Sequence, residues 1–314
     1  MKDINVLNRA WWKEGVIYQI YPRSFKDTTG NGIGDLQGII QKLDYIASLG
    51  VTMVWLNPIY ESPNDDNGYD ISDYRAIMSE FGTMEDFSEL LEGLHERNIK
   101  FIMDVVVNHS SDEHEWFKQS RSSRDNPYRD YYHWWPAEKG KPNHRWSFFD
   151  ENSDAWKYDA QTNAYYLHYF SQKQPDLNWE NPKVRQEVYN IMKFWADKGV
   201  DGFRLDAFQF VSKDIEFPPF PEGYDDNIPS VIKYHGMGPH IHHYLREMYN
   251  EVLSKYDVFA VSEGAGSTLD DAHSIVDEDR NELQMVYHFE GTDLVSSLDK
   301  CTLKDFKASF TKWE

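Results

Sequence analysis

GFRLD, residues 202–206, is a short apolar stretch that ends on a carboxylate, and VFAVSE, residues 258–263, has the same form. Runs of this length and composition are typical of buried strands in a parallel sheet. Arg204 precedes Asp206 by two residues, so on a strand both side chains point to the same face. The Arg204 charge would favour the ionised form of the Asp206 carboxyl. The two stretches therefore predict a pair of strands that end on Asp206 and Glu263.

Four more runs have the β-branched and aromatic composition of strands. The complete set of predicted strands is Val16–Ile20, Thr52–Leu56, Phe101–Val105, Gly202–Leu205, Val258–Val261 and Met285–His288. Between the strands, apolar residues recur three or four positions apart, as on one face of a helix. Residues 36–47, for example, predict a single helix. Strands that alternate with helices indicate an α/β fold, and we expect a (β/α)8 TIM barrel of which about six βα units are present.

The alternation of strands and helices is interrupted between His109 and about Asn178. This segment is rich in Asp, Ser, Arg, Tyr and Trp, shows no sustained periodicity and is too long for an ordinary βα loop. We therefore expect a small subdomain, residues 109–178, inserted after the third strand and built over the strand ends. Residues 1–108 and 179–314 would form the first and second parts of the barrel.

A barrel of this type needs eight strands, and only six are predicted. An open parallel sheet is the alternative, but its uncovered edge would leave N–H and C=O groups without partners. We therefore expect the 314 residues to be a C-terminally truncated piece of a longer barrel. Expressed alone, such a piece should be prone to aggregation.

Composition argues against several classes of protein. The net charge of −21 disfavours nucleic-acid binding, which requires clustered Lys and Arg. No run approaches the ~18 apolar residues of a membrane span, and the first dozen residues lack the apolar core of a signal peptide. Cys301 is the only cysteine, so no intrachain disulfide can form. We expect a soluble cytoplasmic protein, and the sequence leaves its oligomeric state open.

Two carboxylates on neighbouring strand ends suit the cleavage of a glycosidic bond with retention of configuration. In that reaction a nucleophile and an acid/base lie ~5–5.5 Å apart. A plain capping role is the alternative for each acidic residue at a strand end. The aromatic content of 16% also fits a sugar-binding protein, because ring faces stack on C–H surfaces, although packing within loops explains it equally well.

Several motifs in the same order resemble one known family. Residues 104–109 (DVVVNH), residues 202–206 and Glu263 resemble three conserved regions of the α-amylase family, glycoside hydrolase family 13. Residues 67–70 (NGYD), 174–178 (QPDLN) and the opening segment 12–25 resemble its oligo-1,6-glucosidase and α-glucosidase branch. The resemblance extends from Trp11 to about Leu294, nearly the whole chain.

The resemblance implies an α-glucosidase that releases terminal glucose from short oligosaccharides or disaccharides through a glucosyl–Asp206 ester. Asp206 would be the nucleophile and Glu263 the general acid/base. The residues implied to bind the substrate are Tyr69, Asp70, His109, Arg204, Ala207 and Phe170. In this branch a Val after the nucleophile goes with α-1,6 preference, and a smaller residue such as Ala207 goes with α-1,4.

Two other functions stay open. A transglycosylase or sucrose isomerase of the same family would use the same carboxylates with a different acceptor. A non-catalytic carbohydrate-binding or heavy-chain-like homologue usually lacks one or both carboxylates, whereas Asp206 and Glu263 are present. The family's fourth conserved region, Asn-His-Asp, and its C-terminal β-sandwich are absent from these 314 residues, so we expect the chain alone to be inactive.

The loop DTTGNGIGD, residues 27–35, carries oxygen ligands at alternating positions, as in a helix-loop calcium site. The candidate ligands are Asp27, Thr29, Asn31, the backbone carbonyl of Ile33, and Asp35. Gly38 stands where that class of loop has its bidentate Glu, so we expect a weak or structural site. The resemblance implies Ca²⁺, or Mg²⁺, in this loop. An Asx-turn that leads into a capped helix is the alternative.

Overall fold

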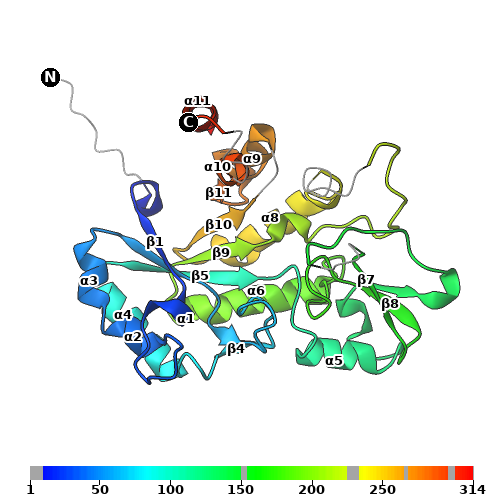
Figure 1. Ribbon diagram of the computed structural model, residues 1–314, viewed down its shortest axis with the longest axis horizontal. Coiled ribbons are helices and arrows are strands. Elements are labelled where there is room, and N and C mark those ends of the chain that lie inside the picture. Colours follow the sequence, from blue (N-terminus) through cyan, green and yellow to red (C-terminus); the bar gives the residue numbers. More distant parts are fainter. Residues whose placement is uncertain (1–9, 150–153, 225–232, 265–267, 296–300, 314) are drawn as a thin grey trace.

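The computed structural model describes residues 10–149, 154–224, 233–264, 268–295 and 301–313. Its centre is a parallel sheet of six strands in chain order, β1-β2-β5-β9-β10-β11. The strands are β1 (Ile17–Ile20), β2 (Met53–Leu56), β5 (Lys100–Val106), β9 (Gly202–Asp206), β10 (Phe259–Glu263) and β11 (Met285–Tyr287). All six predicted strands are confirmed, to within two residues at either end. This strand order is that of a partial (β/α) barrel, as expected (Figure 1).

The register of the sheet brings polar residues of different strands together on one face. Asp104 on β5 pairs with Arg204 on β9. Strands β9 and β10 are paired up to the penultimate residue of each, so their terminal residues, Asp206 and Glu263, are neighbours. Because residues two apart on a strand share a face, Arg204 lies directly below this carboxylate pair.

Helices follow the strands. The α-helices are α1 (Pro22–Phe25), α2 (Leu36–Ile40), α3 (Leu43–Ser48), α4 (Met84–Glu96), α5 (Glu115–Ser122), α6 (Pro182–Asp197), α8 (Ile241–Met248), α9 (Leu269–Val276), α10 (Glu290–Val295) and α11 (Leu303–Trp313). Short 3₁₀ or π turns are η1 (Trp11–Lys13), η2 (Arg129–Tyr131), η3 (Ala137–Lys139), η4 (Phe208–Phe210), η5 (Tyr249–Leu253) and η6 (Glu278–Arg280). None of the helices in the described part of the chain is long and apolar enough to cross a membrane.

Local sequence explains where these helices begin and break. The longest, α6, begins after Asn181, whose side chain accepts from the Lys183 N–H, and it has Pro182 in its first turn. The single helix predicted over residues 36–47 is wrong, because the chain forms two helices there, α2 and α3. The non-helical backbone of Lys42, φ −113° and ψ 9°, separates them.

The segment between β5 and α6 carries its own small sheet. Its three antiparallel strands are β6 (Trp134–Pro136), β7 (Trp156–Asp159) and β8 (Ala164–Leu167), in the order β6-β8-β7. In Figure 1 the arrowhead of β5 points toward this segment. The sequence predicts an inserted subdomain at this place, and its exact limits, 109–178, stay a prediction. The antiparallel pair β3 (Tyr60–Glu61) and β4 (Asp73–Ile77), between β2 and α4, was not predicted.

Candidate active site

A cavity of about 660 Å³ opens at the carboxyl ends of the central strands. This edge of a parallel barrel is where substrates bind, and the volume is ordinary for a ligand site. Seven of the eight residues predicted to bind or cleave the substrate line the cavity: Tyr69, His109, Phe170, Arg204, Asp206, Ala207 and Glu263. The eighth, Asp70, does not.

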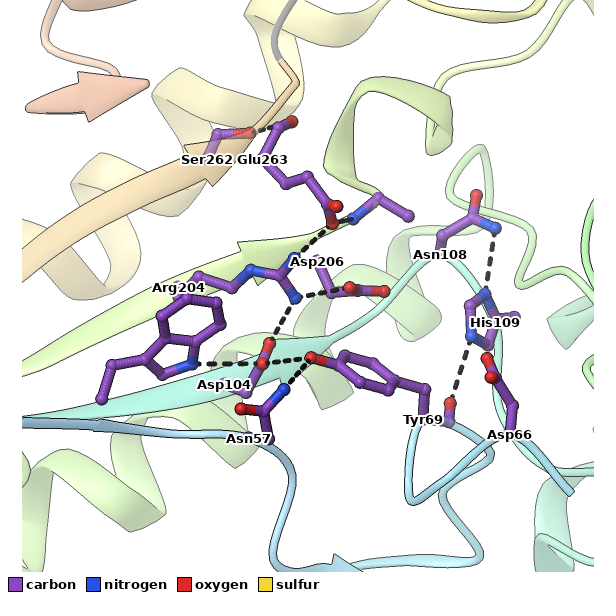
Figure 2. A network of polar contacts seen from close by, with 12 residues as sticks. Asn57, Asp66, Tyr69, Asp104, Asn108, His109, Arg204, Asp206, Ser262 and Glu263 are labelled. Carbon is purple, nitrogen blue, oxygen red and sulfur yellow. Dashed lines mark hydrogen bonds and ion pairs between the residues drawn. The ribbon is translucent and has the colours of Figure 1, made fainter. Parts of the chain in front are cut away.

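Arg204 lines the cavity and lies at the centre of a network of polar contacts (Figure 2). Its Nη1 lies 2.8 Å from Asp104 Oδ1 and 2.5 Å from Asp206 Oδ1, and its Nη2 lies 2.5 Å from Glu263 Oε2. The Arg204 side chain is only 5% exposed. Because Asp206 and Glu263 contact nitrogens of one guanidinium, the two carboxyl groups are held side by side.

Three carboxylates around one guanidinium leave two uncompensated negative charges if all are ionised. Burial is the largest cause that raises the pKa of Glu263, and the negative charge of Asp206 raises it further. The nearby Arg204 opposes both effects, and the pKa is raised to about 8. Burial likewise raises the pKa of Asp104 to about 7, against the opposing effect of Arg204. A carboxyl group that keeps its proton near neutral pH can act as a general acid.

Tyr287, at the end of β11, completes the surroundings of Arg204. Its hydroxyl accepts from Arg204 Nε at 2.9 Å and from Arg204 Nη2 at 2.7 Å. The guanidinium is therefore surrounded by oxygen atoms from four strands, β5, β9, β10 and β11, which hold it against Asp206. Tyr287 was not predicted from the sequence, because no local pattern relates it to a residue 83 positions earlier.

Ala207, directly after Asp206, has the left-handed backbone conformation, with φ at +46°. This conformation is uncommon outside glycine and marks a constrained position. It directs the Ala207 N–H to Glu263 Oε2 at 3.1 Å. The turn after the nucleophile candidate thus also positions the acid candidate.

Tyr69 is held in the cavity wall by a chain of hydrogen bonds. Its hydroxyl donates to Asp104 Oδ2 at 3.1 Å and accepts from Asn57 Nδ2 at 2.8 Å. Trp55 Nε1 donates to the same Asp104 oxygen at 3.2 Å. Burial, followed by the charge of Asp104, raises the pKa of Tyr69, so its hydroxyl stays neutral. Asp104, Trp55 and Asn57 were not among the predicted site residues.

Asp70 was wrongly assigned to the substrate pocket. Its side chain is fully buried and accepts from Ser62 Oγ at 3.0 Å and from the backbone N–H groups of Asp65 at 2.9 Å and Asp66 at 3.0 Å. These bonds use its oxygens to hold the turn. Asp66 lines the cavity instead, and its Oδ2 accepts from Gln174 Nε2 at 3.0 Å.

His109 and Phe170 form the aromatic part of the wall. Their ring centroids are 5.0 Å apart, and Phe148 stacks on Phe170 at 5.0 Å with an interplanar angle of 12°. Gln209, in η4, also lines the cavity and was not predicted. Its Oε1 is buried without a hydrogen-bond partner in the described part of the chain, so its amide is available to a ligand.

The loop of residues 27–35 shows the hydrogen bonds of a capped turn. Asp27 Oδ1 accepts from the N–H groups of Thr29 and Gly30, and Asp27 Oδ2 accepts from that of Gly32. Asp35 caps α2 by accepting from Gly38 N at 2.6 Å. Among the described residues, no group of three or more His, Cys, Asp or Glu side chains is placed to hold a metal. The predicted ligand set has only two carboxylates, so the calcium site stays a prediction.

Known proteins of similar sequence agree with the geometry of this cavity. Residues 19–314 match the family described as alpha amylase, catalytic domain. The chain is 55% identical to an oligo-1,6-glucosidase of Bacillus cereus, with 98% of this chain and 56% of that protein aligned. It is 50% identical to an alpha-glucosidase of Pediococcus pentosaceus, with 91% of this chain and 51% of that protein aligned.

A solved structure is also similar. It is a mutant isomaltulose synthase from Erwinia rhapontici NX5 in complex with its natural substrate sucrose, with a TM-score of 0.85 and 48% identity over 91% of this chain and 51% of that one. The chain spans about half the length of the curated relatives it matches. The strand order, the cavity and the sequence of the chain all indicate the same family. The chain belongs to the α-amylase family, glycoside hydrolase family 13.

Proposed function

We propose that the protein containing this chain is a retaining α-glucosidase that acts on short oligosaccharides or disaccharides. The observation that carries this proposal is the contact of Asp206 and Glu263 with one guanidinium, that of Arg204. The arrangement places the Asp206 carboxyl group against a cation and next to Glu263, whose pKa is raised to about 8. Retaining cleavage needs this combination of a nucleophile and a protonated acid.

The reaction would proceed in two balanced steps. In the first, an Asp206 oxygen attacks the anomeric carbon while Glu263 gives its proton to the glycosidic oxygen, so the bond to the leaving sugar breaks and a glucosyl ester forms. In the second, the ionised Glu263 removes a proton from water, whose oxygen attacks the anomeric carbon and breaks its bond to the Asp206 carboxylate. Glucose leaves with its α-configuration, and both carboxyl groups return to their starting states.

The cavity supports an action on terminal glucose. Asp66, Tyr69 and His109 all line the cavity, where Asp66 offers a hydrogen-bond acceptor and Tyr69 and His109 offer ring surfaces to one sugar. Contacts that strengthen as the sugar ring distorts would stabilise the transition state. We propose that the α-1,4 linkage is preferred over α-1,6, because Ala207 leaves more room beside the leaving sugar than Val would.

A second candidate is isomerisation of sucrose or transfer of glucose to another sugar. The similarity to an isomaltulose synthase with bound sucrose favours it. It shares the Asp206 ester and differs only in the acceptor, which is a sugar hydroxyl in place of water. A purely binding function is disfavoured because both carboxylates and the cation between them are present.

An assay of the natural full-length protein would test the proposal. Maltose, isomaltose, sucrose and trehalose would be supplied separately, and the anomeric form of the first glucose released would be followed by NMR. We expect α-glucose first, with maltose cleaved faster than isomaltose. Release of β-glucose first would contradict retention. Products that are isomers of sucrose, without free glucose, would favour the second candidate.

We also propose that the loop of residues 27–35 binds Ca²⁺. Side-chain oxygens of Asp27, Asn31 and Asp35 are hard donors of the kind that Ca²⁺ prefers. Hydrogen bonds from the loop backbone, with that of Gly32 the strongest, lower the pKa of Asp27 and keep it ionised. The ion would stabilise the fold and take no part in either chemical step. A cytoplasmic location also stays a prediction, which cell fractionation would test.

A further inference from the structure

Lys213 is a buried cation that lies beside the cavity wall. Its side chain is 1% exposed, and its Nζ lies 3.1 Å from Asp176 Oδ2, 3.0 Å from Asn108 Oδ1 and 2.7 Å from the Phe210 carbonyl. The Nζ also lies 4.8 Å from the centre of the Tyr169 ring. An ammonium group has three N–H donors and no acceptor. Lys213 therefore donates hydrogen bonds to Asn108 and Phe210, and it compensates the charge of Asp176 as an ion pair.

Lys213 determines how the Asn108 side chain is oriented. Because an ammonium can only donate, the Asn108 atom that faces it must be the amide oxygen. The amide nitrogen of Asn108 then points the other way and lies 3.3 Å from His109 Nδ1 (Figure 2). Rotating the amide would place its N–H groups against the ammonium, so its orientation is not free.

The orientation of Asn108 in turn selects the tautomer of His109. The Asn108 amide nitrogen can only donate, so Nδ1 of His109 must accept and the ring hydrogen must reside on Nε2. That nitrogen lies 3.2 Å from the Tyr69 carbonyl oxygen, which can only accept (Figure 2). Both contacts are satisfied by the same tautomer.

One contact favours the opposite tautomer. Gln174 Nε2 lies 3.1 Å from His109 Nε2, and Gln174 cannot be reversed, because its Oε1 accepts from Ser171 N and its Nε2 donates to Asp66. With the hydrogen on Nδ1, however, two donors would face each other at Asn108 and two acceptors at Tyr69. The Nε2–H tautomer satisfies two contacts of the fully buried ring and the other only one.

We propose that Lys213 is a positioning residue that, through Asn108, keeps His109 in the Nε2–H tautomer and so fixes the hydrogen bond from His109 to the Tyr69 carbonyl, between two residues of the cavity wall. Lys213 does not itself line the cavity, and it reaches His109 through Asn108. The tautomer itself does not depend on the proposed glucosidase function. Only its consequence for catalysis, the fixed placement of His109 and Tyr69 against the sugar, rests on that function.

Nitrogen-15 NMR of the full-length protein labelled at histidine would test the proposal directly. The wild type should show a protonated Nε2 and an unprotonated Nδ1 for His109, with the signals assigned from their loss in His109→Gln. Asn108→Asp keeps an oxygen for Lys213 and replaces the donor toward His109 by an acceptor. We expect the His109 hydrogen to move to Nδ1 in this variant, and kcat/KM for α-glucosides to fall about tenfold.

Two further variants separate positioning from simple stabilisation. Lys213→Met should shift the His109 tautomer equilibrium, and Lys213→Arg, which also only donates, should restore it. Lys193→Met is the control, because it breaks a partly exposed ion pair between Lys193 on α6 and Glu251 in η5 and should leave the His109 spectrum unchanged. If Lys213→Met fails to fold, Asn108→Asp decides the question.

A wild-type spectrum with Nδ1 protonated, or an unchanged spectrum in Asn108→Asp, would overturn the proposal. A wild type with the expected tautomer but no activity on any α-glucoside would contradict only the glucosidase function. The two outcomes are therefore distinguishable.

Discussion

Two buried cations lie near the cavity, and their surroundings differ in charge. Arg204 contacts three carboxylates, those of Asp104, Asp206 and Glu263. Lys213 contacts one carboxylate, that of Asp176, and its other polar partners are neutral oxygens. The first group has an excess of negative charge, and the second is balanced.

This difference in charge distinguishes a group that can transfer a proton, around Arg204, from a group that only fixes its neighbours, around Lys213. A cluster with too many carboxylates lowers its energy by binding protons, so one of its groups stays protonated near neutral pH and can donate. A balanced pair has no such tendency, and it holds neighbouring groups in fixed orientations. The fold thus places the protonatable carboxyl groups around Arg204 at the strand ends and the Lys213–Asp176 ion pair beside them.

Asp206→Asn should have the largest effect on activity. It removes the nucleophile while it keeps the shape of the side chain, so kcat/KM of the full-length protein should fall by about 10⁴-fold or more. An aryl α-glucoside would provide the assay. Asp201→Asn, at the opposite end of the same strand, is the matched control. It weakens ion pairs with His95 and Lys100 and should change stability more than turnover.

Loss of less than tenfold in Asp206→Asn would show that Asp206 is not the nucleophile. The same variant should also lower the pKa of Glu263, because the Asp206 charge is one of the causes that raise it.

Lys213→Met should have the largest effect on stability. It leaves the fully buried carboxylate of Asp176 without a counter-ion, which should lower the free energy of unfolding by about 3–5 kcal/mol. Urea unfolding would measure this. A double variant, Lys213→Met with Asp176→Leu, should recover most of the loss, since replacing a whole buried pair by apolar groups is often neutral. A double variant as unstable as the single one would contradict the balanced-pair interpretation.

The sequence predicted the parts of this site that depend on local patterns. Short apolar runs that end on acidic residues identified β9 and β10 and with them Asp206 and Glu263. This worked because alternate residues of a strand share a face and the carboxyl ends of parallel strands meet at one edge of the sheet. Arg204 was predicted for the same reason. The sheet order and the partial barrel followed from the alternation of strands and helices.

Other parts depend on contacts between distant segments, which no local pattern encodes. Residues 64–70 (NDDNGYD) contain three aspartates, and only the folded turn shows that Asp66 faces the cavity while Asp70 holds the backbone. Tyr287 reaches Arg204 from another strand. Lys213 meets Asn108 across 105 positions. These residues became visible only with the tertiary structure.

The pH dependence of activity should distinguish the carboxyl groups around Arg204 from the Lys213–Asp176 ion pair. Because the pKa of Glu263 is raised to about 8, the acid should be lost, and kcat/KM should fall, as the pH rises through about 8. Glu263→Gln should remove this alkaline limb from the residual activity. An alkaline limb that persists unchanged in Glu263→Gln would assign the acid to another group.

The free energy of unfolding should also depend on whether the Glu263 carboxyl group is protonated. Glu263 has a raised pKa in the folded state, so its contribution to stability is fully present below about 4.5, its value in the unfolded chain, and is lost as the pH rises toward about 8. The free energy of unfolding of Glu263→Gln should therefore fall less steeply over this interval than that of the wild type. Equal slopes would contradict a raised pKa.

The loop of residues 27–35 is a third charged region, and it differs from both cations because it lies at the surface. Removal of Ca²⁺ with a chelator should lower stability by about 2.7 kcal/mol if the ion was present at a hundred times its dissociation constant. Thermal unfolding with and without chelator would measure this, and Asp27→Ala should abolish the difference. An unchanged melting temperature would leave only the capped turn that the hydrogen bonds already show.

Ala207→Val should produce the smallest effect, and one confined to specificity. Ala207 follows the nucleophile and its N–H holds Glu263, so two extra methyl groups there narrow the space beside the leaving sugar. Groups of this size discriminate between substrates by about 1–3 kcal/mol, and we expect the ratio of isomaltose to maltose cleavage to rise. A branched residue is also strained at a φ of +46°, so stability should fall as well. A rise in the ratio without a fall in stability would mean that the backbone relaxes at this position; an unchanged ratio would mean that residue 207 does not determine linkage.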